Sequence, residues 1–329
     1  MTGLRSGIIG ENRSRVLLSL PAALKTLVSV SILVVLYFKF SSQLPAITSV
    51  DIAAIICAAA VLLLQPVLIG IRWRQVLIAY NMCPPIGGLI NITWVSVFAN
   101  QFLPAGVGGD AIRVFYAQRS GVPINVSIAS VVVDRLVALV ALAMLSVGSV
   151  FYIDGLVDRH LTILFGLALS SGLVIVYVLA RRLAQPLPRK LNKWPLAVKI
   201  ATGLRFMLTI LNSRTNSLIV LANAVGVHLL SALAFVIVAR ALVIDQSTFA
   251  IVTVALALTF VQMIPVSIGG WGLREVASVG LFSAYGVDGG HAALASILLG
   301  VAYLIASLPG AVLWLFTFKN EDIAKAPNG

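Results

Sequence analysis

The chain has 329 residues, of which 60% are hydrophobic and only 10% are charged. A soluble domain carries about a quarter charged residues, so this composition excludes an ordinary soluble fold and a disordered chain. The net charge of +12 would suit a nucleic-acid binder only if the basic residues covered a soluble face, and here they gather between apolar runs. We therefore predict an all-α integral membrane protein that does not bind nucleic acid.

Six apolar runs are long enough to cross a hydrocarbon core of about 30 Å as helices. In chain order they are Leu20 to Phe38, Ile52 to Ile71, Val126 to Phe151, Leu161 to Ala180, Leu218 to Val238 and Ala292 to Phe316. The first run has the basic flank of a signal peptide but no convincing cleavage site after it, so we expect it to be retained. Gln65-Pro66 predicts a kink in the second run.

Two further apolar runs, Ile86 to Leu103 and Phe249 to Ile264, lead into clusters of proline and glycine instead of charged loops. With a cytoplasmic N-terminus, 17 lysines and arginines fall in cytoplasmic segments, four in external segments and two within spans. The positive-inside rule favours this arrangement, but only if both runs return to the side that they entered from. We therefore predict two re-entrant or broken hairpins, the first entered from the cytoplasm and the second from outside.

This topology predicts a multi-pass protein of the cytoplasmic (inner) membrane with both termini in the cytoplasm. Its expected parts are a cytoplasmic N-terminus at 1–19, membrane repeats at 20–153 and 154–317, and a cytoplasmic tail at 318–329. Within the second repeat, the stretch from Arg181 to Arg214 holds eight cations and no acid. Segment 181–216 is therefore predicted to form an amphipathic cytoplasmic segment on an anionic leaflet, although simple positive-inside anchoring explains the charge equally well.

The two break segments align without gaps, at an offset of 161 residues. QFLPAGVGGDAIR from Gln101 to Arg113 and QMIPVSIGGWGLR from Gln262 to Arg274 are identical at five of thirteen positions. Because the two halves enter the membrane from opposite faces, the match predicts an inverted-topology repeat with a transporter-like site near the bilayer midplane. The alternative is that each cluster is an ordinary turn between helices.

Residue type suggests the chemistry of the breaks. Prolines 104 and 265 stop a helix, while the glycine pairs permit positive φ and close approach to a ligand. We expect the return helices to begin near Asp110, as an N-cap, and near Trp271, with their amides directed at the break. The arginine one turn further on in each break could bind a phosphate or carboxylate, or could instead reach its own interface or pair with Asp110 or Glu275. The predicted substrate-binding residues are Gln101, Gly108, Gly109, Arg113, Gln262, Gly269, Gly270 and Arg274, with Asp110, Asp134, Arg135 and Glu275 as secondary candidates.

Asp134 and Arg135 lie inside a predicted span, where an ionisable residue costs at least about 2.5 kcal/mol. Asp134 could couple a proton or cation, but we favour a structural ion pair with Arg113 or Arg135. His228 is interpreted as a helix-to-helix hydrogen bond. The sequence has no phosphate loop, GxSxG, HExxH or CxxC motif, so we expect no enzyme activity, cofactor or metal.

At the breaks the sequence resembles the lysylphosphatidylglycerol synthase transmembrane-region (flippase-like) family. The resemblance rests on NQFLPAGVGGDAIRVFYAQRSG from Asn100, on the Asp134-Arg135 pair, and on IPVSIGGWGLREVASVGLFSAYGV from Ile264. It implies a polytopic fold linked to lipid translocation, with some relatives acting beside glycolipid or hopanoid pathways. We expect no soluble aminoacyl-transferase domain, because the chain stops soon after the last span.

The favoured function is therefore a lipid translocase that moves an anionic or phosphate-bearing lipid across the cytoplasmic membrane. The alternative is a non-transporting subunit or accessory of an enzyme for lipid-linked glycan synthesis or lipid modification, with a glycosyltransferase or lipid-modifying enzyme as partner. The sequence does not define the oligomeric state.

Overall fold

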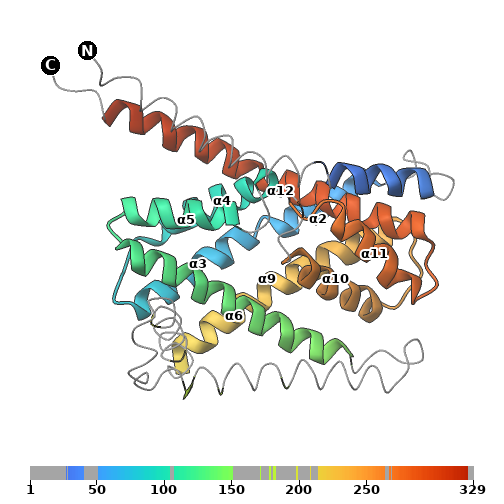
Figure 1. Ribbon diagram of the computed structural model, residues 1–329, viewed down its shortest axis with the longest axis horizontal. Helices are drawn as coiled ribbons and strands as arrows, with labels where there is room; N and C mark the ends of the chain where they lie inside the picture. The colour runs from blue at the N-terminus through green and yellow to red at the C-terminus, as the bar shows by residue number, and fades with distance from the viewer. Residues whose placement is uncertain are drawn as a thin grey trace, which may run out of the picture.

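The computed structural model describes residues 29–40, 51–103, 107–150, 214–263 and 269–324, with residues 27, 171, 178, 181, 182, 198, 208 and 267 as isolated positions. Regular secondary structure in this part of the chain is entirely helical (Figure 1). The helices are α2 (Ile52–Leu62), α3 (Gln65–Ala79), α4 (Ile86–Phe102), α5 (Val107–Arg119), α6 (Ile124–Val150), α9 (Arg214–Ala241), α10 (Thr248–Gln262), α11 (Leu273–Ser283) and α12 (Gly289–Ala324). A short apolar helix, Ser29–Phe40, precedes them.

Four helical stretches of the described part are long and apolar enough to cross a membrane. They are Ile52–Ala79, Ile124–Ser149, Asn216–Ala241 and Gly289–Phe316. These agree with four of the six predicted spans. The predicted first span is described only in its second half, and the predicted span from Leu161 to Ala180 lies outside the described residues, apart from two isolated positions.

The Ile52–Ala79 stretch consists of two helices joined at a local break. Helix α2 ends at Leu62, and α3 begins at Gln65 with Pro66 in its first turn. Proline tolerates this position because the first amides of a helix have no partner within the helix. The predicted kink is therefore confirmed, and the helix continues to Ala79, eight residues beyond the predicted end at Ile71.

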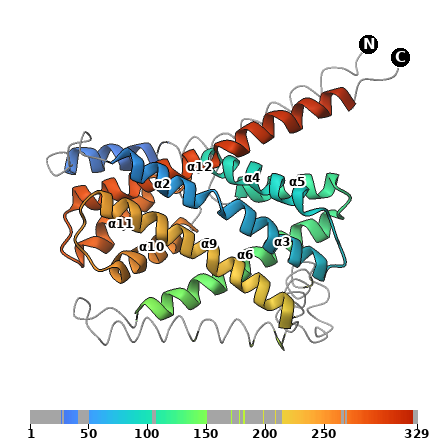
Figure 2. The ribbon, with the colours of Figure 1, turned by 180° about the vertical axis from the view of Figure 1, so that it is seen from behind.

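Each predicted break separates two helices. The first break lies between α4 and α5, and the second lies between α10 and α11. Figures 1 and 2 show the α4–α5 hairpin and the α10–α11 hairpin at opposite ends of the molecule, with α3 and α9 crossing between them. The hairpins therefore approach the central pair from opposite sides.

The predicted starts of the return helices were wrong by a few residues. Helix α5 begins at Val107, so Gly108 and Gly109 are helical and Asp110 lies in the first turn instead of capping it. Helix α11 begins at Leu273 with Gly272 as its N-cap. The predicted positive φ is observed at Gly269 and Gly270 and also at Gly272, whereas Gly108 and Gly109 are helical.

Small residues hold the helices together. One core cluster joins α2, α9, α10, α11 and α12 around Phe235, Ile251 and Phe282, with many buried alanines beside them. A second joins α3, α6 and α9 around Val76, Val133 and Ala224. Between membrane helices, small side chains allow the close backbone approach from which packing gains its energy. Large apolar side chains such as Leu233 and Leu315 are exposed on the outside of the bundle, as expected for a surface facing lipid.

Candidate functional site

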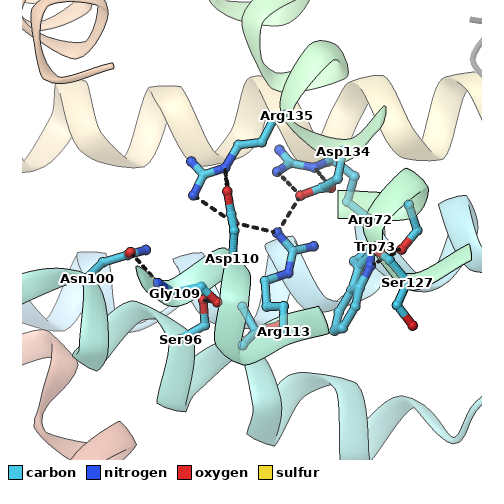
Figure 3. A network of polar contacts seen from close by, with 12 residues as sticks. Arg72, Trp73, Ser96, Asn100, Gly109, Asp110, Arg113, Ser127, Asp134 and Arg135 are labelled. Atoms are coloured by element: carbon cyan, nitrogen blue, oxygen red, sulfur yellow. Dashed lines mark hydrogen bonds and ion pairs between the residues drawn. The ribbon is translucent and has the colours of Figure 1, made fainter. Parts of the chain in front are cut away.

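A buried ion-pair cluster joins α3, α5 and α6 (Figure 3). Arg72 donates from Nε to Asp134 Oδ1 at 2.6 Å and from Nη2 to Asp134 Oδ2 at 3.2 Å. Arg113 donates from Nη1 to Asp134 Oδ2 at 2.9 Å. All three side chains are almost completely buried, with exposed fractions of 4% or less. Asp134, on the spanning helix α6, therefore links α5, the return helix of the first hairpin, to the spanning helix α3.

Trp73 packs against the arginine side chain of Arg113 in this cluster. The Arg113 guanidinium carbon lies 4.3 Å from the centroid of the Trp73 ring, which is a close cation–π contact. The indole N–H of Trp73 donates to Ser130 Oγ on α6 at 3.0 Å. The ring is thereby held in one orientation and fixes the plane against which Arg113 lies.

Asp110 and Arg135 form a second pair beside the first, at the edge of α5 and α6. Arg135 donates from Nε to Asp110 Oδ2 and from Nη2 to Asp110 Oδ1, each at 3.0 Å. These side chains are 23% and 44% exposed, unlike the buried cluster. Asp110 also lies 3.8 Å from Arg113 Nη1. Of the two partners predicted for Asp134, Arg113 is therefore confirmed and Arg135 is not, because Arg135 points to Asp110 while Asp134 points inward to Arg72 and Arg113.

The glycine pair of the first break allows α5 to lie directly against α4. Gly109 donates its N–H to Asn100 Oδ1 at 2.9 Å, and its carbonyl accepts from Ser96 Oγ at 2.9 Å. A Cβ at Gly109 would lie 2.5 Å from the carbonyl oxygen of Ser96. Asn100, and not Asp110, therefore satisfies an amide in the first turn of α5.

A second buried pair occupies the corresponding place in the other hairpin. Arg274 donates from Nε and Nη2 to Glu275 Oε1 at 3.1 and 2.9 Å, and from Nε to Ser296 Oγ on α12 at 3.0 Å. Glu275 also accepts the N–H of Gly272 at 2.6 Å and so caps α11. The alternative of an Arg274–Glu275 pair, left open by the sequence, is the arrangement observed. Arg274 lies 5.0 Å from the centroid of the Trp271 ring, so both hairpin arginines stack on a tryptophan.

The two breaks meet. A Cβ at Gly269 would lie 2.9 Å from the carbonyl oxygen of Gln101, so these two backbones touch although they are 168 residues apart. A Cβ at Gly270 would lie 3.2 Å from Gln262 Cγ within the second break. The side-chain amide of Gln262 donates from Nε2 to Leu258 O in its own helix at 3.4 Å. The backbone contact brings the first and second break segments together at one place in the bundle.

A polar network that the sequence did not predict lies about half-way along the spanning helices. Gln65 Nε2 donates to Val227 O at 2.9 Å and to Ser231 Oγ at 2.7 Å, and the Tyr303 hydroxyl donates to Ser231 Oγ at 2.8 Å. One turn before Ser231, His228 Nε2 lies 2.9 Å from Ala138 O. A carbonyl only accepts, so this nitrogen carries the proton, and the predicted helix-to-helix bond of His228 is confirmed.

Sequence reasoning also missed Arg72, because the apolar run was ended at Ile71 and Arg72 was counted with the cytoplasmic charges. One signal was available. Gly70 alone does not stop a helix, and no proline stands between Pro66 and Pro84, so the helix could continue and carry Arg72 into the bundle. Among the described residues there is no group of three or more His, Cys, Asp or Glu side chains that could hold a metal ion.

These features define a polytopic helical membrane protein in which each of two broken hairpins carries a buried arginine paired with a carboxylate. The chain belongs to the lysylphosphatidylglycerol synthase TM region family, whose sequence model matches residues 22–310. It is also similar to a UPF0104 membrane protein of Methanothermobacter thermautotrophicus, with 22% identity over 279 residues, 76% of this chain and 79% of the relative. The resemblance seen in the sequence is therefore confirmed. No solved structure matches the chain.

Proposed function

We propose that the protein is a lipid translocase of the cytoplasmic membrane that moves an anionic or phosphate-bearing lipid between leaflets. The observation that carries this proposal is the meeting of two broken hairpins, each followed by a buried arginine that stacks on a tryptophan and pairs with a carboxylate. Ionisable groups inside membrane bundles are costly and are usually retained for a substrate or ion pathway.

The packing pattern supports an inverted repeat. Take α2 and α3 as one span and let it correspond to α9, and let α4, α5 and α6 correspond to α10, α11 and α12. When each element is replaced by its counterpart, the list of contacting helix pairs stays the same. The matched contacts are α3–α4 with α9–α10, α4–α5 with α10–α11, α5–α6 with α11–α12, α3–α6 with α9–α12, α2–α12 with α6–α9, and α4–α12 with α6–α10. Transporters built from such repeats work by rocking one part against the other around a central site.

The depths of the polar groups fit this mechanism. Arg72 lies seven residues before the end of α3, roughly 10 Å along the helix. Ser296 lies seven residues after the start of α12, at a similar depth from the opposite end. The network of Gln65, Ser231 and Tyr303 lies between them. A headgroup could therefore pass from one arginine to the other along polar side chains, while its acyl chains remain in lipid.

Transport is tested in vesicles that contain the purified protein and a fluorescent phosphatidylglycerol quenched by dithionite. The wild-type protein is expected to expose the inner-leaflet probe, and Arg113→Gln and Arg274→Gln are expected to abolish this exposure. Arg240→Gln is the matched control, because Arg240 lies near the end of α9, where it donates to Ile244 O and Thr248 Oγ1 and not to the hairpin cluster. Transport that is unchanged in both hairpin variants would exclude this mechanism.

The topology is tested separately by labelling single cysteines in a Cys57→Ser/Cys83→Ser background, since both native cysteines are exposed. Ser120 follows α5 and Ser283 ends α11, so they mark the bases of the two hairpins. An impermeant thiol reagent added to intact cells is expected to label Ser283→Cys and not Ser120→Cys. Labelling of both or neither would contradict opposed hairpins.

The rival function is an accessory subunit of an enzyme that makes or modifies a membrane lipid. It predicts copurification with that enzyme and loss of the lipid product on deletion, without any movement of probe lipids in vesicles.

A further inference from the structure

Three nitrogen atoms of the first arginine cluster have no hydrogen-bond partner among the residues that the structure describes. They are Arg72 Nη1, Arg113 Nε and Arg113 Nη2, and all three are buried. A buried donor without a partner costs about 1–3 kcal/mol, and more when the group is charged. Three such donors in one cluster are therefore expensive for a structural ion pair.

The charges of the cluster do not balance. Arg72 and Arg113 together carry two positive charges, and Asp134 supplies one negative charge. The neighbouring Asp110 and Arg135 neutralise each other. Within the part of the chain that the structure describes, one buried positive charge is left over, and a buried charge without a counter-ion is strongly unfavourable.

The unused donors have the geometry of an anion-binding fork. Arg72 binds Asp134 side-on through its Nε and Nη2 atoms, the edge of a guanidinium that matches two oxygens of a carboxylate or phosphate. The same edge, Nε and Nη2, is the one that Arg113 leaves without a partner. Stacking on Trp73 fixes the plane of that edge.

The second hairpin provides an internal comparison. Arg274 and Glu275 form a balanced pair, and no buried nitrogen of Arg274 is among the unpartnered atoms of the described residues. The same kind of hairpin can therefore hold a buried arginine without leaving donors unused. The surplus charge and free fork are particular to the cluster around Arg113.

We infer that Arg113 and Arg72 form a binding site for one singly charged oxyanion, such as a phosphodiester or a carboxylate, and that Asp134 is its resident counter-ion. The anion binds the free edge of Arg113 and the unused Nη1 of Arg72, while Asp134 keeps its own donors and competes with the anion only for the positive charge of the two guanidinium groups. The assignment of this anion to the headgroup of a transported lipid rests on the proposed function; the anion site itself does not.

Binding is measured by isothermal titration calorimetry on the purified full-length protein in a neutral detergent. The probes are dimethyl phosphate with one charge, sulfate with two, and dioctanoyl phosphatidylglycerol as a lipid that carries the same phosphodiester. At equal ionic strength, dimethyl phosphate is expected to bind more tightly than sulfate. A further gain for the short-chain lipid would identify a lipid headgroup as the source of the anion, and equal affinity would identify a free anion.

The variants separate the site from simple charge attraction. Arg113→Lys keeps the charge but loses the fork, and Arg113→Gln loses both, so each is expected to weaken dimethyl phosphate binding, by about thirtyfold or more for Gln. Asp134→Asn removes the competing counter-ion and is expected to tighten binding by about tenfold. If Asp134→Asn does not fold, Arg72→Gln/Asp134→Asn removes one whole pair and is expected to retain binding through Arg113. Arg240→Gln is the control.

No binding to the wild-type protein, equal binding in Arg113→Lys, or weaker binding in a folded Asp134→Asn protein would each overturn the inference. Anion binding without lipid movement in vesicles would leave the site in place and reject the translocase. Lipid movement without anion binding would support the translocase and reject the anion site.

Discussion

Gly269 lies against the carbonyl oxygen of Gln101, so that a Cβ on the glycine would be 2.9 Å from that oxygen. This contact joins the second break to the first. It leaves no room for a side chain on Gly269, and the positive φ of +57° at this residue adds a second reason for glycine.

Gly269→Ala is therefore expected to disturb both breaks at once and to abolish most lipid movement in vesicles. Gly286→Ala is the matched control, because Gly286 also has a positive φ, of +71°, but no described residue beyond its two chain neighbours comes within 4 Å of its Cβ position. Each variant carries the left-handed backbone cost of about 1–2 kcal/mol, and only Gly269→Ala carries the clash. Equal thermal stability and transport in the two variants would show that the contact between the breaks has no role.

The first hairpin depends on close packing at Gly109. Gly109→Ala would place a methyl group 2.5 Å from Ser96 O and force α5 away from α4. We expect the free energy of unfolding to fall by about 1–3 kcal/mol, as for other overpacked sites. A Cβ at Gly148 on α6 would meet no described residue outside its own helix within 4 Å, so Gly148→Ala is expected to be neutral or slightly stabilising. The comparison is made by thermal unfolding in detergent.

The Arg274–Glu275 pair is expected to behave as one unit. Arg274→Leu leaves the fully buried Glu275 without its counter-ion, and Glu275→Leu leaves Arg274 without its own. Each single variant should lose about 3–5 kcal/mol of unfolding free energy, whereas the double variant should lose less than either. Additive losses would mean that the two side chains do not stabilise each other.

Ser231 is the hub of the central network, because it accepts from both Gln65 and Tyr303. Tyr303→Phe should cost about 1 kcal/mol in the wild-type protein, the usual value of one hydrogen bond. In a Ser231→Ala background the same change should cost much less, since the partner is already absent. A double-mutant cycle on thermal stability measures this coupling, and a value near zero would contradict the assigned bond.

Local sequence signals predicted much of the chain correctly. Long apolar runs placed α6, α9, α12 and the α2–α3 stretch, and the Pro-Gly clusters placed both breaks, because the cost of exposing a backbone amide in lipid acts on each segment by itself. The starts of α5 and α11 were predicted less accurately. They depend on Asn100 accepting a first-turn amide of α5 and on Glu275 accepting the N–H of the N-cap residue Gly272, and several nearby residues could have capped each helix.

The sequence by itself determined that this protein is a bundle of membrane helices with two interrupted hairpins, since hydrophobicity and helix breaking are properties of short segments. Only the tertiary structure decided which charges meet. Asp134 pairs with Arg72 and not with the adjacent Arg135, because α3 extends past Ile71 and packs against α6. A buried charge takes the partner that helix packing brings to it, and that packing depends on side chains far apart in the sequence.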